Sequence, residues 1–341
     1  MTEGCHGVTS HPAGTVRPMT DPTPGAGAPD LGHVLTPVQQ RTLDALRRTD
    51  PPLVFDPAIV AELRHDTDTA LAELGARLGD TELFVTKHAI AGVLDCEAHH
   101  LAPDPFTWTP ARARGQVSHK AIQLLLNWRG EPTPVDLVDE AIARLADEPN
   151  KLGDYVAGLG RGAEADLRGQ AVERVTKFLE CFPPLDRRWH PMTEASAQFP
   201  LAGPIVLRAR VDLIIGRPVE RESRKVIIDL KSGRIMPRHR EDLRFYALVE
   251  TLCRNIPPRK LATFSLDSGA AVVEEVTEGH LRSALRRTLD AIERMVELRV
   301  EGREPRRTPG VSCRWCPLLD ECEPGRASLS ESLDGDADLE P

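Results

Sequence analysis

The sequence predicts an α/β fold in which a mixed sheet is flanked by helices. Two β-branched runs, at 205–215 and 225–231, have the length of strands and are separated by Gly and Pro. The chain before them has apolar residues at helical spacing, and the chain after them alternates helical and strand patterns. Helices, then strands, then a helix and more strands are typical of a sheet with helices packed on it.

Four segments are expected along the chain. Residues 1–35 are rich in Gly, Pro, Ser and Thr without periodic apolar positions, so we expect a disordered N-terminal arm. Residues 36–85 are expected to form a helical extension. Residues 86–325 are expected to form the main domain, with a helical insertion at about 130–185. The stretch 326–341 is expected to be a disordered acidic tail.

The spacing of apolar residues predicts the individual elements of these segments. Helices are expected at 57–78, 86–101, 115–128, around 167–178, 238–254 and 278–301. Two further short strands are expected at 261–266 and 271–276.

Composition restricts the cellular setting. At 341 residues and 40% hydrophobic content the chain can bury a substantial core, and no apolar run approaches the ~20 residues that span a bilayer. We therefore expect no membrane partner and a cytoplasmic protein. Thiols stay reduced there, so the seven cysteines are expected to be ligands or buried thiols rather than disulfides.

Charge is unevenly distributed. The net charge of −9 argues against general binding of polyanions, but the stretch 208–260 has fourteen Lys and Arg against seven Asp and Glu. A basic stripe of this kind suits a phosphate backbone. Charge alone is equally compatible with an ordinary solvated face.

Asp212 ends the apolar half of the first β-branched run, and Asp229 and Lys231 close the second. Side chains alternate along a strand, so Asp229 and Lys231 are expected on one side of the sheet and Leu230 on the other. If the strands pair, Asp212 of the preceding strand joins them. Carboxylates of this kind suit Mg²⁺ or Mn²⁺, which lower the pKa of bound water. The alternative is a strand end whose acid and base simply meet solvent.

Three successive segments carry a family resemblance: Arg210–Ile214, Ile227–Gly233 and Asp242–Leu248. They resemble motifs of the RecB-like branch of the PD-(D/E)XK nucleases, in which an acid ends one strand, (D/E)-x-K closes the next and a Q-x-x-x-Y helix follows. The resemblance implies a three-layer restriction-endonuclease-like core. It also implies metal binding by Asp212, Asp229 and the Leu230 carbonyl, and activation of water by Lys231.

Two further positions follow from this resemblance. Tyr246 falls at the family tyrosine, although a helical tyrosine is also simply explained as a core residue with a solvated hydroxyl. The branch has a histidine ligand on an earlier helix after a glycine, and Gly115 and His119 fit that pattern. Because His119 shares a helical face with apolar residues, a core histidine is the competing interpretation. Asp242 departs from the family glutamine, and Ala209 from a common glycine.

The cysteines are spaced as metal ligands. Cys313, Cys316 and Cys322 form C-x2-C-x5-C near the C-terminus, and Cys96 lies far upstream. Four thiolates select zinc or an iron–sulfur cluster. The order and spacing resemble the iron–sulfur branch of these nucleases (the AddB nuclease domain and the CRISPR-associated spacer-acquisition nuclease), which implies a 4Fe–4S cluster. A zinc site or unrelated buried thiols are the alternatives. Glu97 departs from the proline usual after the first cysteine.

These observations favour a metal-dependent DNA nuclease, exonuclease-like and acting on DNA ends or single strands. The alternative is a catalytically weak or inactive DNA-binding subunit of a repair, recombination or defence complex, and a redox sensor is a third class. The sequence lacks a Walker-type phosphate loop, so a helicase or repair motor would be a separate chain. Cleavage polarity and the preference for DNA or RNA are not determined by the sequence.

Overall fold

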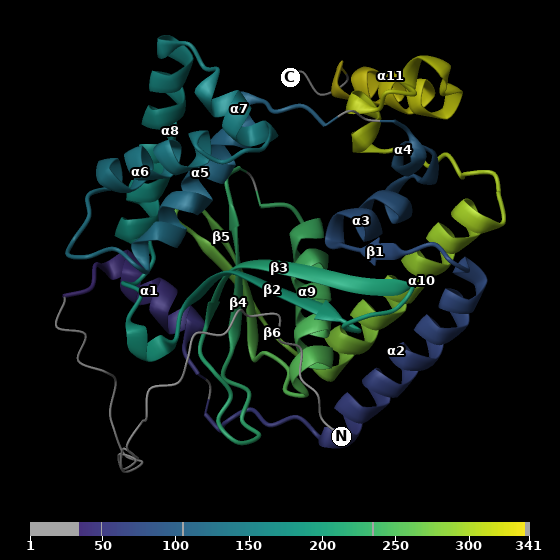
Figure 1. Ribbon diagram of the computed structural model, residues 1–341, viewed down its shortest axis with the longest axis horizontal. Helices are drawn as coiled ribbons and strands as arrows, with labels where there is room; N and C mark the ends of the chain where they lie inside the picture. Colours follow the sequence, from purple (N-terminus) through teal and green to yellow (C-terminus); the bar gives the residue numbers. More distant parts are fainter. Residues whose placement is uncertain (1–33, 49, 104–105, 234, 338–341) are drawn as a thin grey trace.

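A mixed six-stranded sheet forms the centre of the protein (Figure 1). The computed structural model describes residues 34–48, 50–103, 106–233 and 235–337. The expected disorder of 1–35 therefore lies, up to residue 33, outside the described residues. The strands are β1 (Leu83–Val85), β2 (Met192–Phe199), β3 (Ile205–Ile215), β4 (Val226–Lys231), β5 (Lys260–Ser265) and β6 (Ala271–Glu275).

Strand β3 organises the sheet. It pairs antiparallel with β2 and β4 and parallel with β1. On the other side of β4, β5 pairs parallel with β4, and β6 pairs antiparallel with β5. The crossover between β4 and β5 contains α9 (Arg238–Arg254). This pairing satisfies the condition set by the sequence, that the strands containing Asp212 and Asp229 are neighbours.

Helices cover both faces of the sheet. Side chains alternate as expected, with Ile227 in the core beneath one face and Ile228 in the core beneath the other. The first core is formed with α2 (Pro57–Leu78), α3 (Lys87–Asp95), α9 and α10 (Glu278–Val300). The second contains a cluster of three phenylalanines, Phe178, Phe182 and Phe264, with α1 (Pro37–Leu46) and α8 (Arg161–Cys181) packed nearby.

Residues 130–185 are mainly helical in the structure. Helices α5 (Pro110–Leu125), α6 (Pro134–Ala146), α7 (Lys151–Ala157) and α8 enclose a third apolar cluster (Figure 1). Within the described ranges, no helix has both the length and the apolar character needed to cross a membrane.

The structure differs from the sequence predictions at several places. The helix expected at 86–101 is two helices, α3 and α4 (Glu97–Leu101), because Cys96 has extended backbone. Strands β1 and β2 were not predicted, because β1 is only three residues long and β2 consists mainly of small and polar residues. Both are formed by pairing with β3.

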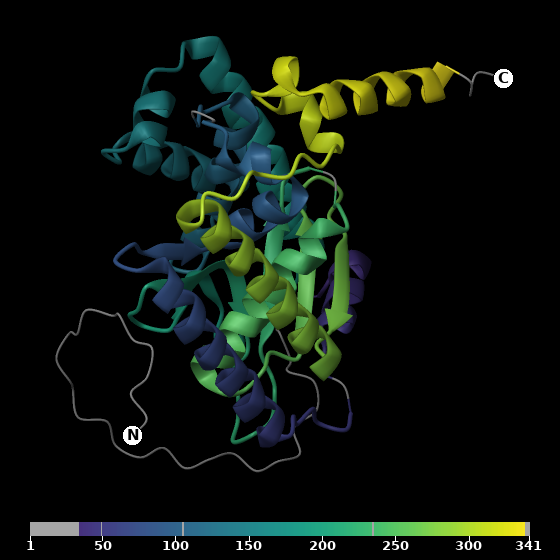
Figure 2. The same cartoon turned by 90° about the vertical axis from the view of Figure 1, so that its right-hand side faces the viewer.

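The expected disordered tail is instead helical over its described part. Helix α11 (Glu323–Ala337) extends away from the body of the protein (Figure 2). Glu323 and Pro324 lie in its first turn. An acid there interacts favourably with the helix dipole, and proline is tolerated because the N–H that it lacks would have no partner within the helix. Acidity therefore did not prevent a helix here.

Candidate active site

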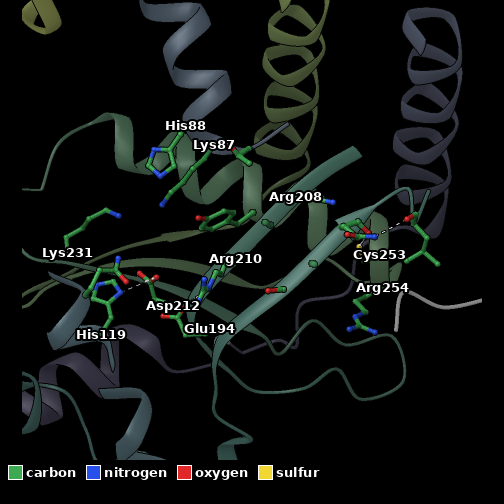
Figure 3. A pocket seen from close by; sticks show the side chains of 18 residues that line it. Lys87, His88, His119, Glu194, Arg208, Arg210, Asp212, Lys231, Cys253 and Arg254 are labelled. Carbon is green, nitrogen blue, oxygen red and sulfur yellow. Dashed lines mark hydrogen bonds and ion pairs between the residues drawn. The ribbon is translucent and has the colours of Figure 1, made fainter. Parts of the chain in front are cut away.

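A cleft of about 750 Å³ opens at the C-terminal end of β4 and runs along β2 and β3. Its lining comes from α3, α5 and α9 as well as from the strands. Figure 3 shows His119, Asp212 and Glu194 gathered in one part of the cleft, with Arg208 and Arg254 farther along it.

His119, Asp212 and Leu230 form a closed set of contacts. The Leu230 N–H donates to Asp212 Oδ2 at 2.7 Å. His119 Nε2 lies 3.1 Å from the Leu230 carbonyl oxygen, and its Nδ1 lies 3.5 Å from Asp212 Oδ1. Three of the sequence-predicted groups, from α5, β3 and β4, are therefore within hydrogen-bonding or ion-pair distance of one another.

Gly115 lets α5 approach the end of β4. A Cβ atom at this position would lie 3.1 Å from Ser232 Oγ, closer than most side-chain contacts. His119 lies four residues later on the same face of α5. The glycine that precedes the histidine in the sequence pattern thus has a packing reason, since it brings the imidazole to the Leu230 carbonyl.

Glu194 is a site residue that the sequence analysis missed. Ligand atoms of Glu194, His119 and Asp212 all lie within 4.8 Å of one another. The pairs Thr193–Leu213 and Ala195–Val211 flank it, so Glu194 lies opposite Asp212 on the neighbouring strand. Its φ of 52° is unusual for a residue other than glycine. Only the register of an unpredicted strand could have identified it.

Asp229 adjoins this group rather than joining it. Its carboxylate is 1% exposed and lies between two ammonium groups: Lys87 donates to Oδ1 at 3.2 Å, and Lys231 Nζ is 2.6 Å from Oδ2. Despite that short distance, Oδ2 accepts no hydrogen bond of favourable geometry from the described residues. Lys87 is the second site residue that the sequence analysis missed.

The pKa values of the imidazole and its acid shift in opposite directions. Burial lowers the pKa of His119, but the charge and hydrogen bond of Asp212 outweigh it and leave that pKa raised. Burial likewise raises the pKa of Asp212, and His119 more than reverses the effect. The site without a cation therefore favours imidazolium beside carboxylate, and a cation bound to His119 has to displace that proton.

Tyr246 lies at the inner wall of the cleft. Burial raises its pKa to about 12, although Lys87 opposes the shift. Lys87 Nζ lies 4.9 Å from the centre of its ring. Tyr246 is also part of the apolar core, which agrees with the interpretation of a core residue at the edge of the cleft. Its role as the family tyrosine stays a prediction.

The four predicted cysteines line one separate pocket, and none of them forms a disulfide. Glu97, the departure beside Cys96, accepts two 2.9 Å hydrogen bonds from the Arg303 guanidinium and one from the Arg306 N–H. This ties Cys96 to the C-terminal segment. A Cβ at Gly325 would lie 3.3 Å from Cys322 Sγ and 3.5 Å from Cys313 Sγ, so α11 begins directly against these sulfurs.

Most of the chain matches a known protein family. A model of the PD-(D/E)XK nuclease superfamily matches residues 90–323, about two thirds of the chain, and this span contains β2 to β6 and the four cysteines of the pocket. The chain belongs to the PD-(D/E)XK nuclease superfamily. The sheet with helices on both faces is the three-layer restriction-endonuclease-like core of that superfamily. The superfamily match also includes His119, Asp212, Asp229 and Lys231.

Solved structures include distant matches to this chain. One is described as a candidate exonuclease from Eubacterium rectale, with 12% identity, a TM-score of 0.46, and coverage of 72% of this chain and 87% of that chain. Another is SSO0001, with 18% identity, a TM-score of 0.27, and coverage of 61% and 94% respectively. No curated protein matches the sequence significantly.

Proposed function

We propose that this member of the superfamily is a Mg²⁺- or Mn²⁺-dependent deoxyribonuclease of the RecB-like, iron–sulfur branch. The observation that carries the proposal is the convergence of His119, Asp212 and the Leu230 carbonyl beside Lys231 in one cleft. Those groups come from three elements, and His119 on α5 is 111 positions from Leu230 in the sequence.

The donor set fits a divalent cation. Carboxylate and carbonyl oxygens suit Mg²⁺ and Mn²⁺, and an imidazole nitrogen extends the preference toward Mn²⁺. The buried Asp229 carboxylate lies between the Lys87 and Lys231 ammonium groups, and a cation would have to compete with them for its oxygens. His119, Asp212, Asp229 and the Leu230 carbonyl would hold the ion, with Glu194 as a further acid. A bound cation would supply an activated water and neutralise charge on the scissile phosphate.

The protein's own groups would position and stabilise the reacting atoms. Lys231 is 23% exposed and points into the cleft, so its ammonium can orient the attacking water and stabilise charge that develops on the phosphate (Figure 3). The Tyr246 hydroxyl, which stays protonated, can donate to a phosphate oxygen. The alternation of side chains on β4 fixes Asp229 and Lys231 on one face of the sheet.

The cysteine pocket supports an iron–sulfur cluster over a single zinc ion. Zinc–thiolate bonds of about 2.3 Å place tetrahedral sulfurs only about 3.8 Å apart. Among the described residues, no three cysteine sulfurs lie within 4.8 Å of one another, although the four cysteines line one pocket. Wider spacing suits a cluster of several iron atoms. Such a cluster would join Cys96 to the C-terminal segment, and its thiolates require the reducing conditions of a cytoplasmic protein.

A path of arginines supports a DNA strand as substrate. Arg208 and Arg210 alternate with apolar residues on β3, and Arg254 lies at the far end of the cleft (Figure 3). Guanidinium groups in one groove can follow successive phosphates. We infer that a single strand or a free end enters along this path. A helicase or repair partner, where one is used, would be a separate chain.

We expect the purified protein to cleave end-labelled single-stranded DNA when Mn²⁺ is supplied, and Asp212→Asn to abolish the cleavage. The asparagine can still accept from the Leu230 N–H but does not supply a charged ligand. Gel analysis with single- and double-stranded substrates measures the effect. Binding of DNA without any divalent-dependent cleavage would instead support the alternative, a DNA-binding subunit.

The arginine path predicts a change in salt dependence. Replacing Arg208 or Arg254 with alanine should weaken binding of single-stranded DNA and reduce the slope of log K against log salt by about 0.7 for each lost phosphate contact. Fluorescence anisotropy over a range of salt concentrations provides the measurement. Arg168→Ala is the control, because Arg168 pairs with Asp139 in the helical insertion away from the cleft. An unchanged slope for both cleft variants would contradict the proposed path.

A further inference from the structure

Lys87 occupies an unusual position beside the site. It is the first residue of α3, whose start is fixed by the Thr86 hydroxyl accepting from the Ala89 N–H at 3.2 Å. Its side chain is only 12% exposed. The ammonium donates to Asp229 Oδ1 at 3.2 Å, lies 3.8 Å from Asp242 Oδ2 and faces the Tyr246 ring.

Lys87 also lies close to Asp242. Asp242 stands where the resembling motif has a neutral glutamine, and the structure places its carboxylate within ion-pair distance of the Lys87 ammonium. The ammonium therefore lies between two acids, one nearly fully buried and one 17% exposed. It contacts the buried acid at hydrogen-bonding distance and has a second carboxylate only slightly farther away.

A buried carboxylate is costly unless a positive charge compensates it. Lys231 and Lys87 both compensate Asp229, and both do so without a cation. A divalent cation that binds Asp229 brings its own positive charge. It would be repelled by the Lys87 ammonium, which lies 3.2 Å from Asp229 Oδ1. If the Lys87 ammonium can move to another acid when the ion binds, the free energy needed to bind the ion is smaller.

We propose that Lys87 is an internal counter-ion of Asp229 that competes with the divalent cation, and that Asp242 is the acid that accepts Lys87 when the cation binds. The pair thereby sets the metal affinity of the site. This inference rests on the proposed metal-dependent function. It makes Lys87 a positioning residue, which acts through Asp229.

The test is a calorimetric titration of the full chain with Mn²⁺. Lys87→Met should tighten binding, with the Kd falling about tenfold, because the competing charge is gone. Asp242→Asn should weaken binding by a similar factor, because Lys87 then loses its second carboxylate and stays beside Asp229. In the double variant the loss of Asp242 should cost nothing further, so its Kd should equal that of Lys87→Met.

Two controls isolate the effect. Lys87→Arg keeps the charge and should bind Mn²⁺ as the wild type does, within about twofold. Lys120→Met removes a lysine that pairs with Glu148 and does not line the cleft, and should leave the Kd unchanged. Melting curves add a second measurement: Lys87→Met should lower the melting temperature without Mn²⁺ and gain more from Mn²⁺ than the wild type gains.

Several outcomes would overturn the inference. Equal Kd values for the wild type and Lys87→Met would do so, as would additive effects in the double variant. A higher KM for DNA with an unchanged Kd for Mn²⁺ would assign Lys87 to phosphate binding instead. If the wild type binds no Mn²⁺ at all, the proposed function fails, which is a different result from Mn²⁺ binding that Lys87 does not affect.

Discussion

Replacing Lys231 with methionine is expected to lower the rate of DNA cleavage by about 10²–10³-fold, the usual effect of removing a group that stabilises charge in the transition state. The ammonium points into the cleft and contacts Asp229 at 2.6 Å. Because lysine supplies no ligand atom, Mn²⁺ binding should be retained or become tighter. Methionine keeps the length of the side chain, so the loss reports on the charge.

Single-turnover cleavage of end-labelled DNA at saturating Mn²⁺ measures this effect, and calorimetry confirms that the ion still binds. Lys120→Met is again a suitable control, since it removes a lysine from α5 whose partner Glu148 lies outside the cleft. Cleavage by Lys231→Met at the wild-type rate would show that the D-x-K lysine has no catalytic role.

The second large effect is expected at the cysteine pocket. Cys316→Ser should remove the iron and the visible absorbance of anaerobically purified protein and lower its melting temperature by about 10 °C, the effect of a few kcal/mol in a chain of this size. The cluster would tie Cys96, at the break between α3 and α4, to the segment before α11. Losing it would release the C-terminal segment, leaving mainly the Glu97–Arg303 pair.

Metal analysis, the absorbance spectrum and thermal melting measure this outcome. Cys253→Ser is a matched control, because Cys253 lines the separate cleft along β2 and β3 and its sulfur contacts the Gln198 carbonyl, so iron content should not change. A colourless, folded wild type that contains zinc would replace the cluster assignment with a zinc site. Iron retained in Cys316→Ser would exclude that cysteine as a ligand.

Local sequence patterns predicted much of the framework. The β-branched runs of β3 and β4 and the spacing of α9 and α10 were recognisable because alternation and helical periodicity are properties of consecutive residues. The same periodicity placed Asp229 and Lys231 on one face of β4. Strand β2 has no such pattern, and pairing with β3 forms it.

Two residues of the candidate site could be found only from contacts between segments that are distant in the sequence. Glu194 became visible only when the register placed it opposite Asp212, and Lys87 only when α3 packed against the end of β4. The role of Asp242 was likewise not visible in the sequence. In the sequence it is a departure from a motif, whereas in the structure it is a partner of Lys87.

By itself, the sequence determined the class of fold, the face of β4 that holds Asp229 and Lys231, and the grouping of the three C-terminal cysteines, because each is encoded in short-range spacing or in residue type. The tertiary structure decided which charges meet. Asp229 is held by a lysine 142 positions earlier in the chain as well as by its neighbour Lys231, and the energy of such ion pairs depends on distance and burial, which residue spacing does not specify.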